Sequence, residues 1–175
     1  MYSPAEDTFL LIKGIEKFPG LGKVLEIGIG SGKVAEVLSW KAIMYIGCDI
    51  ELNILGQILS KPFQRTELVC CDSATCFVNN YFDTIIFNPP YLPSEEVIDR
   101  TIDGGKEGNE IILKFLESSF KLIKPKGSIF FIISSLANVQ KIKDFVYSNG
   151  FDFKEVIREH FIFEDICLFW CQNLS

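Results

Sequence analysis

The chain has 175 residues, of which 48% are hydrophobic and 23% are charged, and its formal net charge is -6. These values predict one globular domain over residues 1–175, since roughly 150 residues already bury a sizeable core. They argue against a membrane protein, because no apolar run approaches the roughly 18 residues of a span. They also disfavour a nucleic-acid substrate, whose phosphates are bound by basic residues.

In chain order, the residue patterns predict alternating helices and strands. Helices are expected at residues 4–17, 33–40, 53–59, 109–123 and 139–149. Strands are expected at 23–27, 42–48, 67–71, 82–87 and 128–133, with two more between 151 and 170 joined near Glu159-His160. Strands separated by helices of this length indicate a doubly wound, mostly parallel α/β sheet. The last two strands are expected to form an antiparallel hairpin.

The first residues and the cysteines indicate where the protein is located and whether its thiols are reduced. The first seven residues contain two acids and a proline and lack the basic and apolar regions of a secretory signal, so we expect a cytoplasmic location. None of the six cysteines forms a C-x-x-C pair, which favours reduced structural thiols over disulfides or a metal site. These residues are Cys48, Cys70, Cys71, Cys76, Cys167 and Cys171.

The first strand leads into a glycine-rich turn, Glu26-Ile27-Gly28-Ile29-Gly30-Ser31-Gly32. Glycines at Gly28 and Gly30 allow positive φ and let a ligand approach the backbone closely. A dinucleotide fingerprint would need a glycine or alanine where Lys33 stands, so a pyrophosphate fits poorly. Glu26 would repel a phosphate but suits the ammonium group of an amino acid.

Two further acids follow the next two predicted strands. Asp49 is placed to accept hydrogen bonds from both hydroxyls of a ribose. The Asp72 carboxylate or the Ser73 N-H group is placed to meet an adenine edge. Each acid could instead be an ordinary helix cap or turn residue. Together with Glu26 and the glycine turn, they predict a pocket for a cationic nucleoside, and S-adenosylmethionine fits that description.

The fourth predicted strand ends at Asn88-Pro89-Pro90-Tyr91. Two prolines cannot continue a β ladder, because each lacks an N-H group. The carbonyl groups of Asn88 and Pro89, the Asn88 amide and the Tyr91 ring are therefore expected at the carboxyl edge of the sheet. Such a cluster suits a planar NH2 group, which can donate to two oxygens and stack on a ring. An ordinary proline turn is the alternative.

These motifs resemble the class I S-adenosylmethionine-dependent methyltransferases that methylate amino groups. The opening Tyr2 to Leu11 and the segment Gly104 to Gly108 resemble the eukaryotic and archaeal HemK-like branch, which methylates the glutamine of the Gly-Gly-Gln motif in class I release factors. The resemblance implies a seven-stranded Rossmann-like sheet of order 3-2-1-4-5-7-6 and S-adenosylmethionine as cofactor. It implies cofactor contacts from Thr8, Glu26, Gly28, Gly30, Asp49, Asp72, Ser73 and Asn88. It implies substrate binding and catalysis at Asn88, Pro89, Pro90 and Tyr91.

The resemblance also implies a partner. Eukaryotic members typically form a heterodimer with a small zinc-binding activator subunit, which covers an apolar surface at the edge of the sheet. The predicted third strand, Leu68-Val69-Cys70-Cys71, would be an apolar edge that needs such a cover. A chain that is simply rich in core phenylalanines is the alternative explanation of the high apolar content.

Two other functions stay open at this point. A DNA or RNA amino-methyltransferase would act on an exocyclic base amine, which presents the same planar NH2 group as an amide and can stack on a tyrosine after base flipping. A catalytically silent scaffold would bind only a partner subunit. The acidic charge disfavours the first, and the intact Glu26, Asp49, Asp72 and Asn88 disfavour the second.

Overall fold

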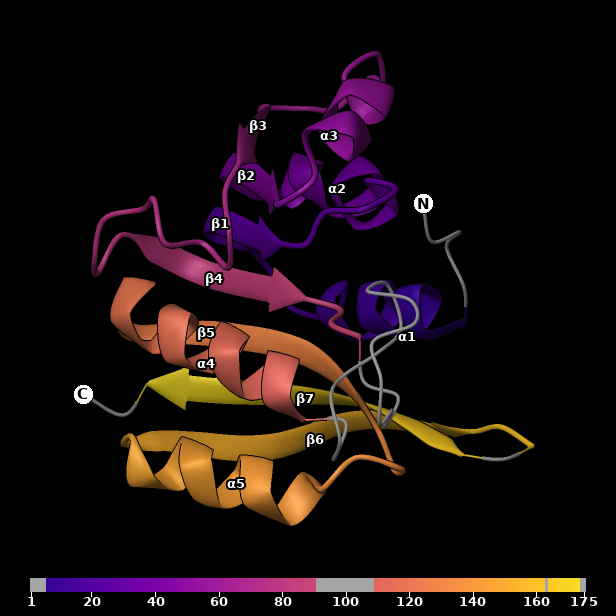
Figure 1. Ribbon diagram of the computed structural model, residues 1–175, viewed down its shortest axis with the longest axis vertical. Coiled ribbons are helices and arrows are strands. Elements are labelled where there is room, and N and C mark those ends of the chain that lie inside the picture. The colour runs from indigo at the N-terminus through magenta and orange to yellow at the C-terminus, as the bar shows by residue number, and fades with distance from the viewer. Residues whose placement is uncertain (1–5, 91–108, 163, 174–175) are drawn as a thin grey trace.

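A computed structural model describes residues 6–90, 109–162 and 164–173 of the chain, and Figure 1 shows its arrangement. Seven strands in these residues form one sheet in the order β3-β2-β1-β4-β5-β7-β6. They are β1 (Gly22–Ile27), β2 (Ala42–Asp49), β3 (Thr66–Cys70), β4 (Phe82–Phe87), β5 (Ile123–Ser134), β6 (Phe151–His160) and β7 (Asp165–Asn173). Neighbouring strands are parallel except that β7 is antiparallel to both β5 and β6. This topology confirms the predicted fold class.

Helices cover both faces of the sheet (Figure 1). They are α1 (Glu6–Ile15), α2 (Lys33–Leu38), the short 3-10 helix η1 (Ser39–Lys41), α3 (Leu52–Ile58), α4 (Glu110–Leu122) and α5 (Val139–Ser148). Apolar residues of α1, α2 and α3 belong to one core cluster, and those of α4 and α5 belong to the other. In the described residues, no helix is long and apolar enough to cross a membrane.

The central strand β5 contributes to both core clusters by alternation of its side chains. In β5, Phe130 and Ile132 pack into the cluster of α1, whereas Phe131 and Ile133 pack into the cluster of α4. Successive side chains of a strand point to opposite faces, so a strand that is covered twice must be apolar at every position. This requirement explains the continuous apolar run of β5.

The start of β5 differs from the prediction. Residues 124–127 were expected to end a helix and precede a strand at 128–133, but β5 already begins at Ile123. Ile123 pairs with Phe82, and the register then jumps so that Ser128 pairs with Thr84. Lys124, next to Ile123, reaches the Asp83 carboxylate at 2.7 Å. Tertiary pairing with β4 therefore extends the strand across residues whose local chemistry favours a turn.

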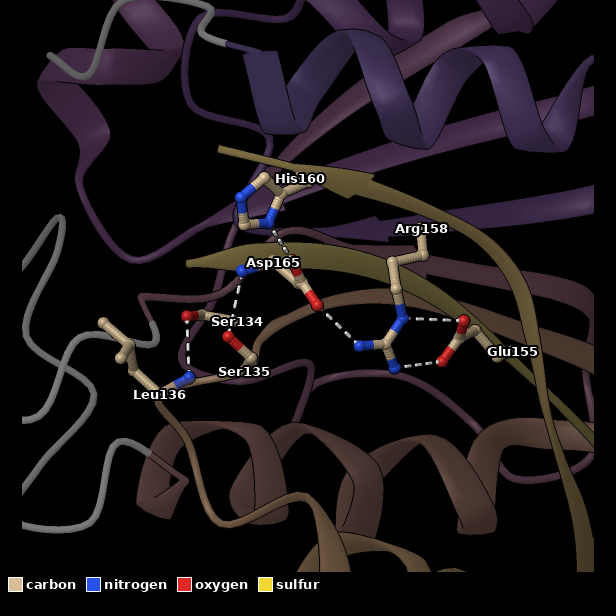
Figure 2. Close-up of polar contacts among 7 residues, drawn as sticks. All are labelled: Ser134, Ser135, Leu136, Glu155, Arg158, His160 and Asp165. Carbon is tan, nitrogen blue, oxygen red and sulfur yellow. Dashed lines mark hydrogen bonds and ion pairs between the residues drawn. The ribbon is translucent and has the colours of Figure 1, made fainter. Parts of the chain in front are cut away.

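The link between the last two strands also lies later than predicted. His160 belongs to β6, and the turn follows it. Figure 2 shows how polar side chains brace this hairpin. Arg158 donates to Glu155 at 2.7 and 3.0 Å and to Asp165 at 2.8 Å. The other oxygen of Asp165 lies 2.7 Å from His160 Nδ1. The Arg158–Asp165 ion pair joins β6 to β7 across the turn, whereas the Arg158–Glu155 pair lies within β6.

The first residue of β1, Gly22, offers a test of the fold. Gly22 has a φ of 64°, and a Cβ there would lie 2.6 Å from the Asp83 Cβ. Asp83 accepts the N-H group of Lys23 at 2.8 Å, so a shift of its side chain would also disturb β1. We expect Gly22→Ala to lower the free energy of unfolding by about 1–3 kcal/mol.

Urea unfolding followed by circular dichroism measures this change. Gly20→Ala is the matched control, because a Cβ at Gly20 would meet nothing within 4 Å. Equal stabilities of the two variants would contradict the account of Gly22.

Candidate active site

The carboxyl ends of the parallel strands surround a cavity of about 460 Å³, a usual size for a small-molecule site. Nine of the predicted site residues line it: Thr8, Glu26, Gly28, Gly30, Asp49, Asp72, Ser73, Asn88 and Pro90. Pro89 is buried next to them and does not line the cavity. Tyr91 lies outside the described residues. The structure thus brings the predicted residues to one place, while the role of each stays a prediction.

The glycine turn leaves an open wall on the cavity. Gly28 and Gly30 have φ values of 73° and 49°. The N-H group of Gly28 donates to the Cys48 carbonyl of β2 at 2.8 Å, which ties the turn to the neighbouring strand. A Cβ at Gly28 would meet nothing within 4 Å. The glycine is therefore needed for its backbone conformation, and the bare backbone lies open to a ligand.

Asp49 at the end of β2 is buried and bonds to the backbone of two segments. Its Oδ2 accepts the Gly30 N-H group at 3.1 Å, and its Oδ1 accepts the Glu51 N-H group at 3.0 Å. The carboxylate thereby fixes both the glycine turn and the start of α3. Each oxygen retains capacity for another donor, because an ionised carboxylate accepts about four hydrogen bonds. The turn role and the ligand role considered from sequence are therefore compatible.

Glu26 at the end of β1 is a buried acid that accepts hydrogen bonds from the Tyr45 side chain and the Ala35 backbone. The Tyr45 hydroxyl of β2 donates to its Oε2 at 2.7 Å. Burial raises the pKa of Glu26 from 4.5 to about 8, the Tyr45 hydrogen bond opposes this, and the Asp49 charge adds to it. The carboxyl group is thus expected to be mostly protonated at neutral pH in the empty cavity. A cation next to it would favour the charged form.

Asp72, two residues after β3, accepts from two side chains. The Ser73 hydroxyl donates to its Oδ1 at 2.6 Å, and the Lys114 ammonium group lies 3.0 Å from the same oxygen. These two hydrogen bonds, that of Ser73 first, lower the pKa of Asp72. Ser73 is buried and has a φ of 48°, which is uncommon for a residue with a side chain. The turn is therefore held in one conformation on the cavity wall.

Asn88 follows β4, the central strand between β1 and β5. Its Oδ1 atom is buried and has no hydrogen-bond partner in the structure as described. Burying an amide oxygen without a donor costs free energy, and most buried polar atoms are paired. Because Asn88 lines the cavity, the missing donor is a group that a bound molecule can supply.

Sequence reasoning missed the wall that α4 contributes. Ile111, Lys114 and Phe115 line the cavity from this helix, although they lie far along the chain from the glycine turn. Their spacing, i, i+3 and i+4, places them on one helix face. This spacing could have identified a shared face, but an amphipathic pattern does not distinguish a face on a ligand from a face on the core.

Comparison with known proteins places the chain in a family. Residues 46–158, more than half of the chain, match the family model described as Eco57I restriction-modification methylase. A protein N5-glutamine methyltransferase of Methanocaldococcus jannaschii is 30% identical over 95% of this chain and 88% of its own length. The chain belongs to the HemK-like class I methyltransferases. The methyltransferase HEMK2 of Mus musculus is 29% identical to this family member over 81% of this chain and 75% of its own length.

A solved structure agrees with this HemK-like assignment at the level of the fold. The Mtq2-Trm112 complex of E. cuniculi, which is responsible for the methylation of the translation termination factor eRF1, matches with a TM-score of 0.82. The match covers 98% of both chains at 21% identity. The chain is therefore an S-adenosylmethionine-dependent methyltransferase by family, and its fold is that of the class.

The residues of this HemK-like enzyme fit S-adenosylmethionine. The cavity offers an acid buried at Glu26, a fixed carboxylate at Asp49 and an open backbone at Gly28. Glu26 suits the ammonium group of the cofactor, and Asp49 suits its two ribose hydroxyls. The open backbone at Gly28 suits close packing of the cofactor's amino-acid chain. The unpartnered Asn88 oxygen lies on the same cavity and is available to an acceptor substrate.

The raised pKa of Glu26 predicts a dependence of stability on pH. The folded chain retains a proton that the unfolded chain loses between its usual pKa of 4.5 and about 8. The stabilising contribution of the protonated Glu26 is therefore complete below pH 4.5 and is lost as the pH rises from 4.5 through about 8. The slope approaches about 1.4 kcal/mol per pH unit.

Glu26→Gln keeps an acceptor for Tyr45 and carries no titrating proton. We expect this variant to be more stable than the unchanged chain at pH 8 and nearly equal to it at pH 4.5. Chemical unfolding at a series of pH values measures the difference between the two chains. A difference that does not grow with pH would contradict the assignment of a raised pKa to Glu26.

Proposed function

We propose that the enzyme transfers the methyl group of S-adenosylmethionine to the side-chain amide nitrogen of the glutamine in the Gly-Gly-Gln motif of a class I release factor. The names of the relatives support this reaction, among them the eRF1 methyltransferase catalytic subunit of Schizosaccharomyces pombe, which is 25% identical over 90% of this chain and 83% of its own length. The observation that carries the proposal is the buried Asn88 oxygen without a donor. A planar amide supplies that donor.

The donor side of the site follows from the cavity walls. S-adenosylmethionine, when bound, supplies an electrophilic methyl group. In our proposal Glu26 binds the ammonium group, Asp49 accepts both ribose hydroxyls, and Asp72 with the Ser73 N-H group meets the adenine edge. Gly28 and Gly30 allow the close approach of the amino-acid chain, and Thr8 closes the cavity from α1. The carboxylates complement the positive charge of the cofactor.

The acceptor side needs orientation more than acid-base chemistry. An amide nitrogen is a weak nucleophile because its lone pair is delocalised into the carbonyl group. Asn88 Oδ1 and the Pro89 carbonyl accept hydrogen bonds from its two N-H groups. These bonds orient the nitrogen and make it more electron-rich. Pro90 and Tyr91 complete the substrate site, with the ring stacking on the amide. Proximity and water exclusion supply most of the rate enhancement in this proposal.

A nucleic-acid substrate is the second candidate, favoured by one observation. The family model that matches residues 46–158 is that of a restriction-modification methylase. An exocyclic base amine would satisfy Asn88 Oδ1 in the same way as an amide. The net charge of -6 weighs against it, because phosphate binding needs basic residues.

A partner subunit is proposed for the β3 edge. β3 is the terminal strand of the sheet, with Leu68 and Val69 half-buried and Cys70 exposed. Ile43 on the neighbouring β2 is 72% exposed. An apolar open edge recruits another strand, so a small zinc-binding activator subunit fits here along Leu68 to Cys71. In the same proposal, residues 1–175 form a single catalytic domain that acts in the cytoplasm as part of a heterodimer.

Two substitutions separate the donor and acceptor roles. Asn88→Ala should lower the turnover of a release factor at least about 100-fold, since positioning accounts for much of the barrier, while the Kd for S-adenosylhomocysteine stays nearly unchanged. Asp49→Ala should instead weaken that Kd. Titration calorimetry and transfer of labelled methyl groups measure the two quantities.

Assays with a release factor and with an oligonucleotide, each with and without the zinc subunit, distinguish the two substrate classes.

An active Asn88→Ala variant would refute the acceptor role, and unchanged binding by Asp49→Ala would refute the nucleoside pocket. Methylation of the oligonucleotide alone would overturn the release-factor proposal in favour of the second candidate.

The proposed partner predicts a local change in hydrogen exchange. Backbone amides of residues 66–70 should exchange more slowly in a 1:1 complex with the zinc subunit, because a new strand would pair with the edge. Amides of β6, at the opposite edge, serve as the internal control. Protection elsewhere with none at β3 would move the interface away from this strand.

A further inference from the structure

Lys114 of α4 forms an ion pair across the cavity with Asp72. Its Nζ atom lies 3.0 Å from Oδ1 and 3.2 Å from Oδ2 of the carboxylate, and both residues line the cavity. Asp72 follows β3, whereas α4 follows β4, and β2 and β1 lie between these two strands in the sheet. The pair therefore joins two walls that the sheet order keeps apart.

The contacts described for the two acids on the helix of Lys114 are with other residues. Glu117, three positions later, accepts from Lys121 at 3.0 Å. Glu110, four positions earlier, accepts the N-H group of Asn109 at 3.2 Å. Acids three or four residues away are the usual partners of a helix lysine. Lys114 reaches instead to a residue 42 positions away in the sequence.

The contacts of Asp72 are asymmetric. Among the described residues, Oδ1 accepts from both the Ser73 hydroxyl, at 2.6 Å, and Lys114, whereas Oδ2 accepts from Lys114. Two donors on different segments prevent the carboxylate from rotating freely. Oδ2 retains capacity for a donor from a ligand. An acceptor whose orientation is already fixed loses less entropy when it binds that donor.

The exposure of the pair determines how it can act. The two side chains are about half exposed, 51% for Lys114 and 52% for Asp72. Exposed ion pairs contribute little to folding stability, because water screens the charges. A role that orients Asp72 for a ligand would appear in binding and not in unfolding, and this difference separates it from a merely structural contact.

We propose that Lys114 is a positioning residue that fixes the Asp72 carboxylate to accept the 6-amino group of the cofactor's adenine, and so contributes to selection of a 6-amino over a 6-oxo purine. This inference rests on the adenine role of Asp72 in the proposed function. A 6-oxo purine presents an oxygen at that position, which cannot donate to a carboxylate. Loss of Lys114 should therefore weaken the binding of the adenine cofactor and leave that of its 6-oxo analogue unchanged.

Titration calorimetry of the full chain with S-adenosylhomocysteine and S-inosylhomocysteine tests the proposal. Lys114→Met should weaken binding of the adenine ligand about fivefold, the scale of one modest hydrogen bond, and leave binding of the inosine ligand unchanged. Lys121→Met, on the same helix, is the matched control and should change neither ligand. Lys114→Arg should restore most of the affinity. The unfolding midpoint of each variant verifies that it folds.

A double-mutant cycle with Asp72→Ala, which removes the acceptor, separates the possible failures. In that background, Lys114→Met should have no further effect on the adenine ligand. An equal loss in both backgrounds, an equal loss for both ligands, or no loss at all would overturn the positioning role of Lys114. If Asp72→Ala itself binds the adenine ligand as tightly as the unchanged chain, the adenine role of Asp72 in the proposed function fails, and the inference fails with it.

Discussion

The Asp49 carboxylate is the contact on which the cavity depends. One oxygen accepts from the glycine turn after β1 at Gly30, and the other accepts from Glu51 at the start of α3. Two adjacent parallel strands end here, and the residues that follow them leave in different directions. A single buried acid holds both departing segments, so the open backbone at Gly28 faces a cavity of defined shape. Ligand binding can then use a geometry that the fold already maintains.

Other polar groups at this edge are held at a cost to stability. Glu26 lies in a site that favours its neutral form, and Asn88 Oδ1 is buried with no donor among the described residues. Both conditions are unfavourable in the free protein. A cation next to Glu26 and an amide next to Asn88 would relieve them. The site therefore combines a well-packed core, in which Phe87 and Phe131 stack on each other, with polar groups whose partners are expected from ligands.

The fold was predictable because its signals are local and repeated. Apolar strands that lead to Gly28, Asp49 and Asn88 alternate with amphipathic helices. This alternation indicates a parallel sheet with ligands at its carboxyl edge. The predictions were wrong where long-range pairing prevailed over local chemistry. β5 extends back to Ile123 because β4 offers it a partner, and β6 continues to His160 because β7 pairs with it.

The residue types and their order along the chain determined the fold class, the glycine turn and the identity of most residues that line the cavity. Only the tertiary structure decided that Asp49 binds two backbone segments, that Tyr45 bonds to Glu26, and that α4 closes the cavity with Lys114. The reason is physical. A motif reports what a short segment can do by itself, whereas hydrogen bonds between distant segments and the loss of solvation on burial exist only when the packed sheet brings those segments together.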